Sequence, residues 1–146
     1  MKEDIIAILH QKISEKMSEA ELAIKNVQDA ANNDSKSSMG DKYETSREMA
    51  QQDLSMLCRQ YEAAREDLQT LGMVNLHDNE KVSKGSFVST TIGEIFIAVN
   101  YGFLKINDKK VIVTAPNSPL GQSLMGKKIG QDFEVQGKKQ KIITIS

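Results

Sequence analysis

The sequence predicts an α+β protein, in which an N-terminal antiparallel α-helical coiled-coil hairpin precedes a small antiparallel β domain with one short helix. Three observations predict it. Apolar residues recur every three or four positions as far as residue 71, and short β-type runs separated by turn residues begin near residue 86. The charge also changes sign, because residues 1–80 carry 9 Lys and Arg against 16 Asp and Glu, whereas residues 81–146 carry 10 against 4. Such asymmetry indicates two units with different partners.

The composition limits the class of protein. A chain of 146 residues can form one ordinary domain or two small ones, and 5% aromatic residues without Trp favour an elongated helical part. The single cysteine, Cys58, cannot form a disulfide within the chain, which indicates a reducing cytosol. The N-terminus opens with charged residues and no long apolar run, so we expect a cytoplasmic protein with neither a signal peptide nor a membrane partner.

A first helix is predicted over residues of about 2 to 32. Its apolar positions are separated by three or four residues, the seam of a coiled-coil helix. These positions are Ile6, Leu9, Ile13, Met17, Ala20, Ile24, Val27 and Ala31. Several of them are alanine, so a partner helix can approach closely. The pattern stops where residues 32–38 bring Asn, Asp and Ser, which favour turns over helix.

A second helix is predicted over residues of about 42 to 71, with an end at Gly72 as its C′ residue. Its seam is regular and consists of Ala50, Leu54, Leu57, Tyr61, Ala64, Leu68 and Leu71. Two seams of similar length joined by a short polar loop favour an antiparallel pair within one chain over a parallel dimer of single helices. We therefore expect a monomer with a coiled-coil hairpin over residues 1–75.

The tip of this hairpin is predicted at residues 39–44, Met-Gly-Asp-Lys-Tyr-Glu. Two carboxylates, Asp41 and Glu44, would then project from the far end of the arm. Asp-x-x-Glu before a helix is also the spacing of a capping box, and acidic residues there complement the helix dipole. The two roles are compatible, because a capping residue at a hairpin tip can still face a metal ion.

Residues 76–84 have no periodic pattern and are predicted to be a linker. Five strands are predicted beyond it, over residues 86–91, 95–99, 110–114, 132–135 and 141–145, with turn signals at residues 100–102, 107–108 and 136–137. Ser118 as N-cap and Pro119 at the first helical position begin one short helix, which Gly126 can end. Residues 85–146 thus form the predicted β domain.

The segment Ser118–Gly130 resembles the C-terminal signature of the Gre-type (GreA and GreB) transcript-cleavage factors of bacterial RNA polymerase. That signature begins with Ser-Pro, continues through Gly-Lys and precedes a Val-x-Val strand, which Phe133-Glu134-Val135 supplies here. The family tip begins Gly-Asp-x-x-Glu, and Gly40, Asp41 and Glu44 fall on its glycine and its two acids. The resemblance covers nearly the whole chain. It implies a coiled-coil hairpin followed by an FKBP-like domain that docks on RNA polymerase.

The resemblance implies a bacterial transcription elongation factor whose hairpin enters the secondary channel of RNA polymerase. Asp41 and Glu44 would help to hold the second, weakly bound Mg²⁺ of the polymerase active site and stimulate cleavage of backtracked RNA. The chain would have no cofactor of its own and would not be an enzyme alone. The residues expected to contact the polymerase or the RNA 3′ end are Tyr43, Lys42, Arg47, Ser118, Pro119, Gly126 and Lys127.

Alternative functions remain open at this point. The family tip continues with Asn and a Glu-Tyr pair, which are replaced here by Thr45, Arg47 and Glu48. A non-cleaving inhibitor or regulator of the polymerase is therefore an alternative function. An FKBP-like isomerase or chaperone would need an aromatic pocket, usually with a Trp that this chain lacks. A structural coiled-coil adaptor is a further alternative. Weak nucleic-acid contact and solubilisation are alternative roles for the C-terminal lysines, and no phosphate-binding loop, catalytic triad or zinc pattern is present.

Overall fold

The computed structural model describes the backbone of residues 2–34 and 40–146 and the side chains of residues 2–30 and 47–146. It contains two compact units, Leu9–Gln69 and the combination of Met1–Ile8 with Thr70–Ser146. The first unit is the greater part of a helical hairpin. The second unit consists of the β domain together with the start of the first long helix and the end of the second.

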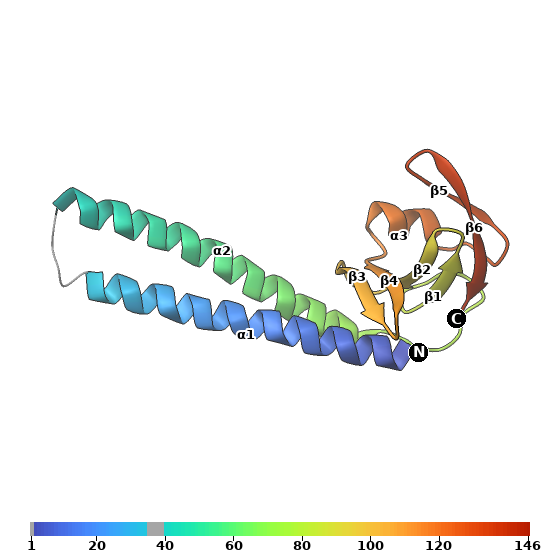
Figure 1. Ribbon diagram of the computed structural model, residues 1–146, viewed down its shortest axis with the longest axis horizontal. Helices are drawn as coiled ribbons and strands as arrows, with labels where there is room; N and C mark the ends of the chain where they lie inside the picture. The colour runs from blue at the N-terminus through green and yellow to red at the C-terminus, as the bar shows by residue number, and fades with distance from the viewer. Residues whose placement is uncertain (1, 35–39) are drawn as a thin grey trace. The chain divides into compact units, whose positions relative to one another are not determined.

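Two long antiparallel helices, α1 (Lys2–Asp34) and α2 (Gly40–Met73), form the hairpin (Figure 1). With 33 and 34 residues, each extends about 50 Å. Both predicted seams are confirmed, because every seam position with a described side chain is buried or half-buried. Burial is greater near the base, where Ile13 and Ala64 are 3% and 7% exposed, than towards the loop, where Ala50 is half-buried.

The predicted end of the second helix was wrong in one detail. α2 continues through Gly72 to Met73, and Gly72 does not have the positive φ that a C′ residue adopts. Glycine can adopt the backbone angles of a helix, so its presence does not by itself end one. The ends of both helices otherwise lie within two residues of the predicted ends, a normal uncertainty for helix termini.

The β domain contains one sheet of six strands in the order β3-β4-β2-β1-β6-β5. The strands are β1 (Phe87–Thr90), β2 (Gly93–Ile97), β3 (Gly102–Ile106), β4 (Lys109–Thr114), β5 (Asp132–Val135) and β6 (Lys138–Ile145). All neighbouring pairs are antiparallel except β2 and β4, which are parallel. The expectation of a purely antiparallel domain is corrected by this one pair. The short helix α3 (Pro119–Leu124) lies between β4 and β5 in the chain and packs against β5.

The prediction of five strands omitted β3. This strand lies at the edge of the sheet, and only Leu104 and Ile106 of its five residues are buried. It is held by pairing with β4 through the turn at Asn107 and Asp108, whose φ values of 48° and 66° are both positive. Two positive φ values are typical of a tight hairpin turn, and Asn and Asp tolerate them best among non-glycine residues.

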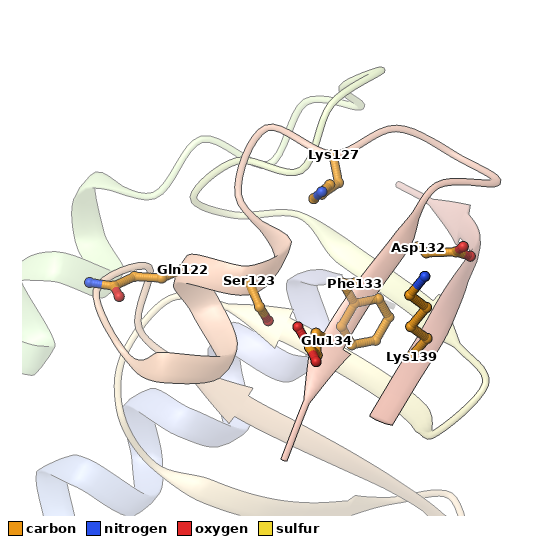
Figure 2. Close-up of a pocket in the computed structure, with 7 residues that line it drawn as sticks. All are labelled: Gln122, Ser123, Lys127, Asp132, Phe133, Glu134 and Lys139. Carbon is orange, nitrogen blue, oxygen red and sulfur yellow. The ribbon is translucent and has the colours of Figure 1, made fainter. Parts of the chain in front are cut away.

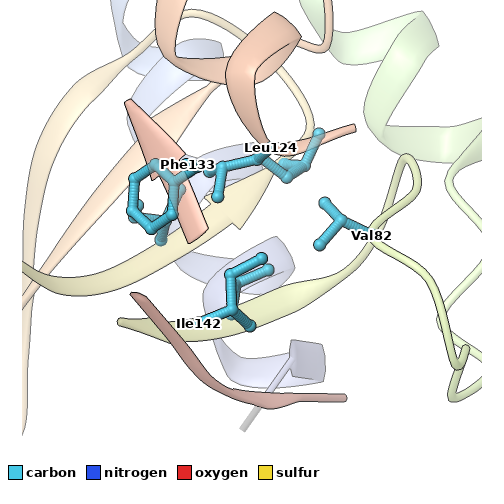
Figure 3. Close-up of a cluster of buried hydrophobic side chains, with 7 residues drawn as sticks. Val82, Leu124, Phe133 and Ile142 are labelled. Carbon is cyan, nitrogen blue, oxygen red and sulfur yellow. The ribbon is translucent and has the colours of Figure 1, made fainter. Parts of the chain in front are cut away.

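A cluster of seven buried side chains on one face of the sheet forms the core of the β domain (Figure 3). They are Val82, Val88, Ile95, Ile97, Leu124, Phe133 and Ile142. Leu124 comes from α3, so this short helix covers that face. Phe96, which points to the opposite face, is also fully buried, and so is Ile5 from the base of α1. Buried side chains therefore lie on both faces of the sheet.

Val82 comes from residues 76–84, the segment predicted to be a linker. Its backbone N–H donates to Lys127 O at 2.8 Å, and its carbonyl accepts from Gly126 N at 2.9 Å. The side chain is 2% exposed within the core. At least this part of the segment is therefore packed into the β domain rather than spanning free space.

Candidate functional site

The predicted tip falls at the start of α2, which begins at Gly40. Asp41, Lys42, Tyr43 and Glu44 lie in the first turns of this helix, and their side chains are outside the described residues, as is Met39 entirely. Arg47 is the nearest tip residue with a described side chain, and it is exposed on α2. The backbone thus places the Gly-Asp-x-x-Glu sequence at the loop end of the hairpin.

The second group of predicted residues is built around the start of α3. Ser118 is the N-cap, and its Oγ accepts a hydrogen bond from Gly121 N at 2.9 Å. The same hydroxyl donates to Ala115 O at 2.8 Å and bonds to the hydroxyl of Thr114. Pro119 follows at the first position and is exposed. The predicted cap is confirmed, so Ser118 has a structural role whatever else it contacts.

Gly126 lies just after α3 and has a φ of 79°, a conformation that costs a glycine little. It allows the chain to turn so that Gly126 N and Lys127 O reach Val82. Nothing lies within 4 Å of the position where a Cβ of Gly126 would stand. The positive φ, rather than a lack of space for a side chain, therefore explains why glycine stands at position 126.

Two shallow clefts follow α3 and β5. The first, of about 420 Å³, is lined by Gln122, Ser123, Lys127, Asp132, Phe133, Glu134 and Lys139 (Figure 2). The second, of about 350 Å³, is lined by Thr114, Ser118, Pro119, Leu120, Glu134, Val135 and Gln136. Glu134 lines both, so α3 and β5 border a single surface, which we name the α3–β5 surface. It includes Ser118, Pro119 and Lys127.

The α3–β5 surface carries both signs of charge. On β5 and β6, Asp132 stands opposite Lys141 and Glu134 opposite Lys139 in the antiparallel register. Opposite charges in such positions stabilise a pair of strands modestly. Glu134 is not among the site residues predicted from the sequence, and it is an exposed residue of β5 beside the buried Phe133.

Among the hairpin carboxyl groups with described side chains, that of Asp67 has an altered pKa. Partial burial beside the seam raises the pKa of Asp67 above its ordinary value of 3.8, and the neighbouring Glu66 raises it further. Lys16 on the facing helix opposes both effects. The antiparallel pairing of α1 and α2 brings Lys16 and Asp67 close enough to interact.

No group of three or more His, Cys, Asp or Glu side chains that could hold a metal ion occurs among residues 2–30 and 47–146. Within the same part of the chain, no helix combines the length and the apolar character needed to cross a membrane.

Comparison with known proteins found no matching family model and no matching curated protein. Among solved structures, that of the transcription factor Gfh1 is 14% identical over 96% of this chain and 92% of that chain, with a TM-score of 0.36. The GreA factor homolog 1 (Gfh1) protein of Thermus thermophilus is 11% identical over 98% and 93%, with a TM-score of 0.36. Thermus aquaticus Gfh1 is 12% identical over 92% of both chains, with a TM-score of 0.35. At these TM-scores, none of the likenesses assigns a function to this chain.

Proposed function

We propose that this chain is a bacterial transcription elongation factor that binds RNA polymerase and inserts its hairpin into the secondary channel. One observation carries the proposal: the Gly-Asp-x-x-Glu sequence begins the second of two helices, each about 50 Å long, at the loop end of a hairpin. A rigid arm of this length can carry carboxylates into a narrow channel. The Ser-Pro segment that resembles the Gre signature begins α3 in the β domain.

In this proposal Asp41 and Glu44 add metal ligands to those that the polymerase itself provides. They are three residues apart, and such residues share one face of a helix. Carboxylate oxygens are the ligands that Mg²⁺ prefers. Together they would help to hold the second Mg²⁺ of the polymerase and orient a water molecule towards the RNA phosphodiester. The chain supplies these ligands and the polymerase supplies the catalytic site, so the chain alone is not an enzyme.

The α3–β5 surface is the proposed docking surface of the β domain. Pro119 and Lys127 are the residues to test, because Ser118 and Gly126 are needed for the local fold. The full-length protein would be immobilised and RNA polymerase retention measured. Pro119→Ala and Lys127→Gln should weaken retention, whereas Lys84→Gln, which removes an exposed lysine from the same domain, should not. Full retention by both surface variants would exclude this docking surface.

Cleavage of RNA in backtracked complexes tests the tip. Wild-type protein should stimulate cleavage, and Asp41→Ala and Glu44→Ala should abolish most of the stimulation. Asp53→Ala removes an exposed acid from the same helix and should leave it intact. Equal stimulation by wild type and both tip variants would remove the metal-ligand role.

A non-cleaving regulator of the polymerase is the second candidate. The observation that favours it is the replacement of family tip residues by Thr45, Arg47 and Glu48. The same assay separates the two functions: a regulator would bind the polymerase and slow elongation without stimulating cleavage. Failure of the immobilised protein to retain RNA polymerase would overturn both.

A further inference from the structure

The edge strand β3 exposes an aromatic side chain among lysines. Phe103 is 63% exposed, the most exposed aromatic residue among the described large apolar side chains. Lys110, on the neighbouring strand β4, lies with its Nζ 3.8 Å from the centre of the Phe103 ring. Lys105 is two residues along β3 from Phe103, so both side chains point to the same face of the sheet. We name Phe103, Lys105 and Lys110 the β3 patch.

The register of the sheet concentrates positive charge in the β3 patch. Lys105 and Lys110 are direct partners across the β3–β4 pair. Like charges in directly opposite positions destabilise a strand pair. Among the described side chains, no carboxylate lies within 4.0 Å of either lysine, whereas the adjacent Lys109 reaches Glu94 at 4.0 Å. The pair Lys105 and Lys110 therefore lacks a counter-charge that an anionic ligand would supply.

Protection of the sheet edge against pairing with other chains explains only part of the β3 patch. Lysines on an edge strand discourage pairing with other chains, which accounts for Lys105. It does not account for an exposed phenylalanine beside them, because an exposed aromatic residue on an edge favours association. One side of the ring is occupied by Lys110, and the large exposed fraction leaves the rest open to a planar partner.

We propose that the β3 patch binds single-stranded nucleic acid. A base would stack on the open side of the Phe103 ring, and Lys105 and Lys110 would each neutralise a flanking phosphate. Aromatic stacking with unpaired bases and lysine contacts with phosphates are the two interactions by which proteins bind single strands without sequence preference. The patch has no feature that selects RNA over DNA, so both are expected to bind. The β3 patch shares no residue with the tip or with the α3–β5 surface.

Fluorescence anisotropy of labelled oligouridylate and oligothymidylate 12-mers, titrated with the full-length protein at several salt concentrations, tests the proposal. Phe103→Leu keeps an apolar residue and all charges, and should weaken binding about tenfold, the size of one lost stacking contact. The double variant Lys105→Gln with Lys110→Gln should lower the salt slope by about 1.4, as two lost phosphate contacts on a single strand predict. Urea denaturation should show that these exposed substitutions leave the fold intact.

Three controls make the test specific. Lys138→Gln with Lys141→Gln removes the same charge from exposed positions on β6 that line neither cleft of the α3–β5 surface, and should change binding little. An abasic oligomer with the same number of phosphates should bind wild type and Phe103→Leu equally weakly. Polyglutamate should compete poorly, because it offers charge without bases.

The outcomes that would overturn the proposal are distinct. Wild-type affinity of Phe103→Leu would show that no base stacks there. Equal losses in the β3 and β6 double lysine variants would show only non-specific attraction to a basic domain. Tight polyglutamate binding that depends on all three residues would assign the patch to an acidic protein instead. None of these outcomes depends on the polymerase, so the proposed function would stand or fall separately.

Discussion

Lys2 Nζ donates a hydrogen bond to the carbonyl of Leu76 at 3.3 Å, across 74 residues of sequence. It also reaches His77 O at 3.5 Å and Asp78 Oδ1 at 3.7 Å, although Lys2 itself is only 9% exposed. A buried lysine is costly unless its ammonium group is bonded. These contacts join the first turn of α1 to the segment that leaves α2, so the base of the hairpin is fixed where the chain passes into the β domain.

Replacing Lys2 with Met should therefore lower the free energy of unfolding by about 1–3 kcal/mol, because the carbonyls of Leu76 and His77 lose their charged donor. Urea denaturation measures the change. Asp78→Asn is the matched variant for the ion pair. The Asp78 side chain is 89% exposed, and an exposed ion pair contributes little, so the loss should stay within about 1 kcal/mol. A larger effect of Asp78→Asn than of Lys2→Met would contradict this ranking.

Val82→Ala tests whether the segment between hairpin and sheet belongs to the core. Complete burial of a valine side chain contributes about 1.5–3 kcal/mol, and Val82 is 2% exposed. We expect the free energy of unfolding to fall by about 2 kcal/mol in chemical denaturation. Ile129→Ala serves as the control, because Ile129 is 58% exposed and should change stability by less than about 0.5 kcal/mol. Similar small effects of both substitutions would mean that the segment is not packed as described.

Two glycines should respond to alanine in opposite directions. A Cβ on Gly121 would stand 2.1 Å from the carbonyl oxygen of Ala115, a backbone atom that cannot move freely. Gly121→Ala should therefore destabilise the β domain by about 1–3 kcal/mol, the usual cost of overpacking. Gly72 lies inside α2 with nothing within 4 Å of its Cβ position, so Gly72→Ala should stabilise the protein by about 0.5–1 kcal/mol. Thermal melts of the two variants should shift in opposite directions, and a shift in the same direction would refute the explanation.

The raised pKa of Asp67 makes the hairpin slightly more stable when this carboxyl group is protonated. The folded chain holds the proton more strongly than the unfolded chain, so this contribution is present below the unfolded pKa and is lost as pH rises through the folded pKa. At pH 7 the ionised carboxylate remains partly buried at a cost. Asp67→Asn should thus stabilise the protein at pH 7 by about 0.5 kcal/mol at most, with a smaller gain near pH 3.

Urea denaturation at the two pH values measures this difference. Asp53→Asn, at an exposed position of the same helix, should show equally small changes at both. A gain for Asp67→Asn that is larger at pH 3 than at pH 7 would contradict the direction of the shift.

Much of the fold was predictable because it depends on neighbours in sequence. Seam residues such as Leu9 and Leu57 lie three or four positions from the next apolar residue, and the helical period alone places them on one face. The N-cap of α3 was predictable for the same reason, since Ser118, Pro119 and Gly121 are within one turn. The tip motif could be placed at the hairpin loop, while its side-chain geometry lies outside the described residues.

What the sequence by itself determined is therefore local: two helices with matched seams, one capped short helix and most of the strands. The tertiary structure decided the rest. β3 is a strand because β4 pairs with it, Val82 is a core residue because Gly126 and Lys127 hold its backbone, and Lys110 lies over Phe103 because the register places them diagonally. The neighbours of these residues in the sequence do not specify such contacts. Their energies depend on long-range pairing and burial, which only the folded chain provides.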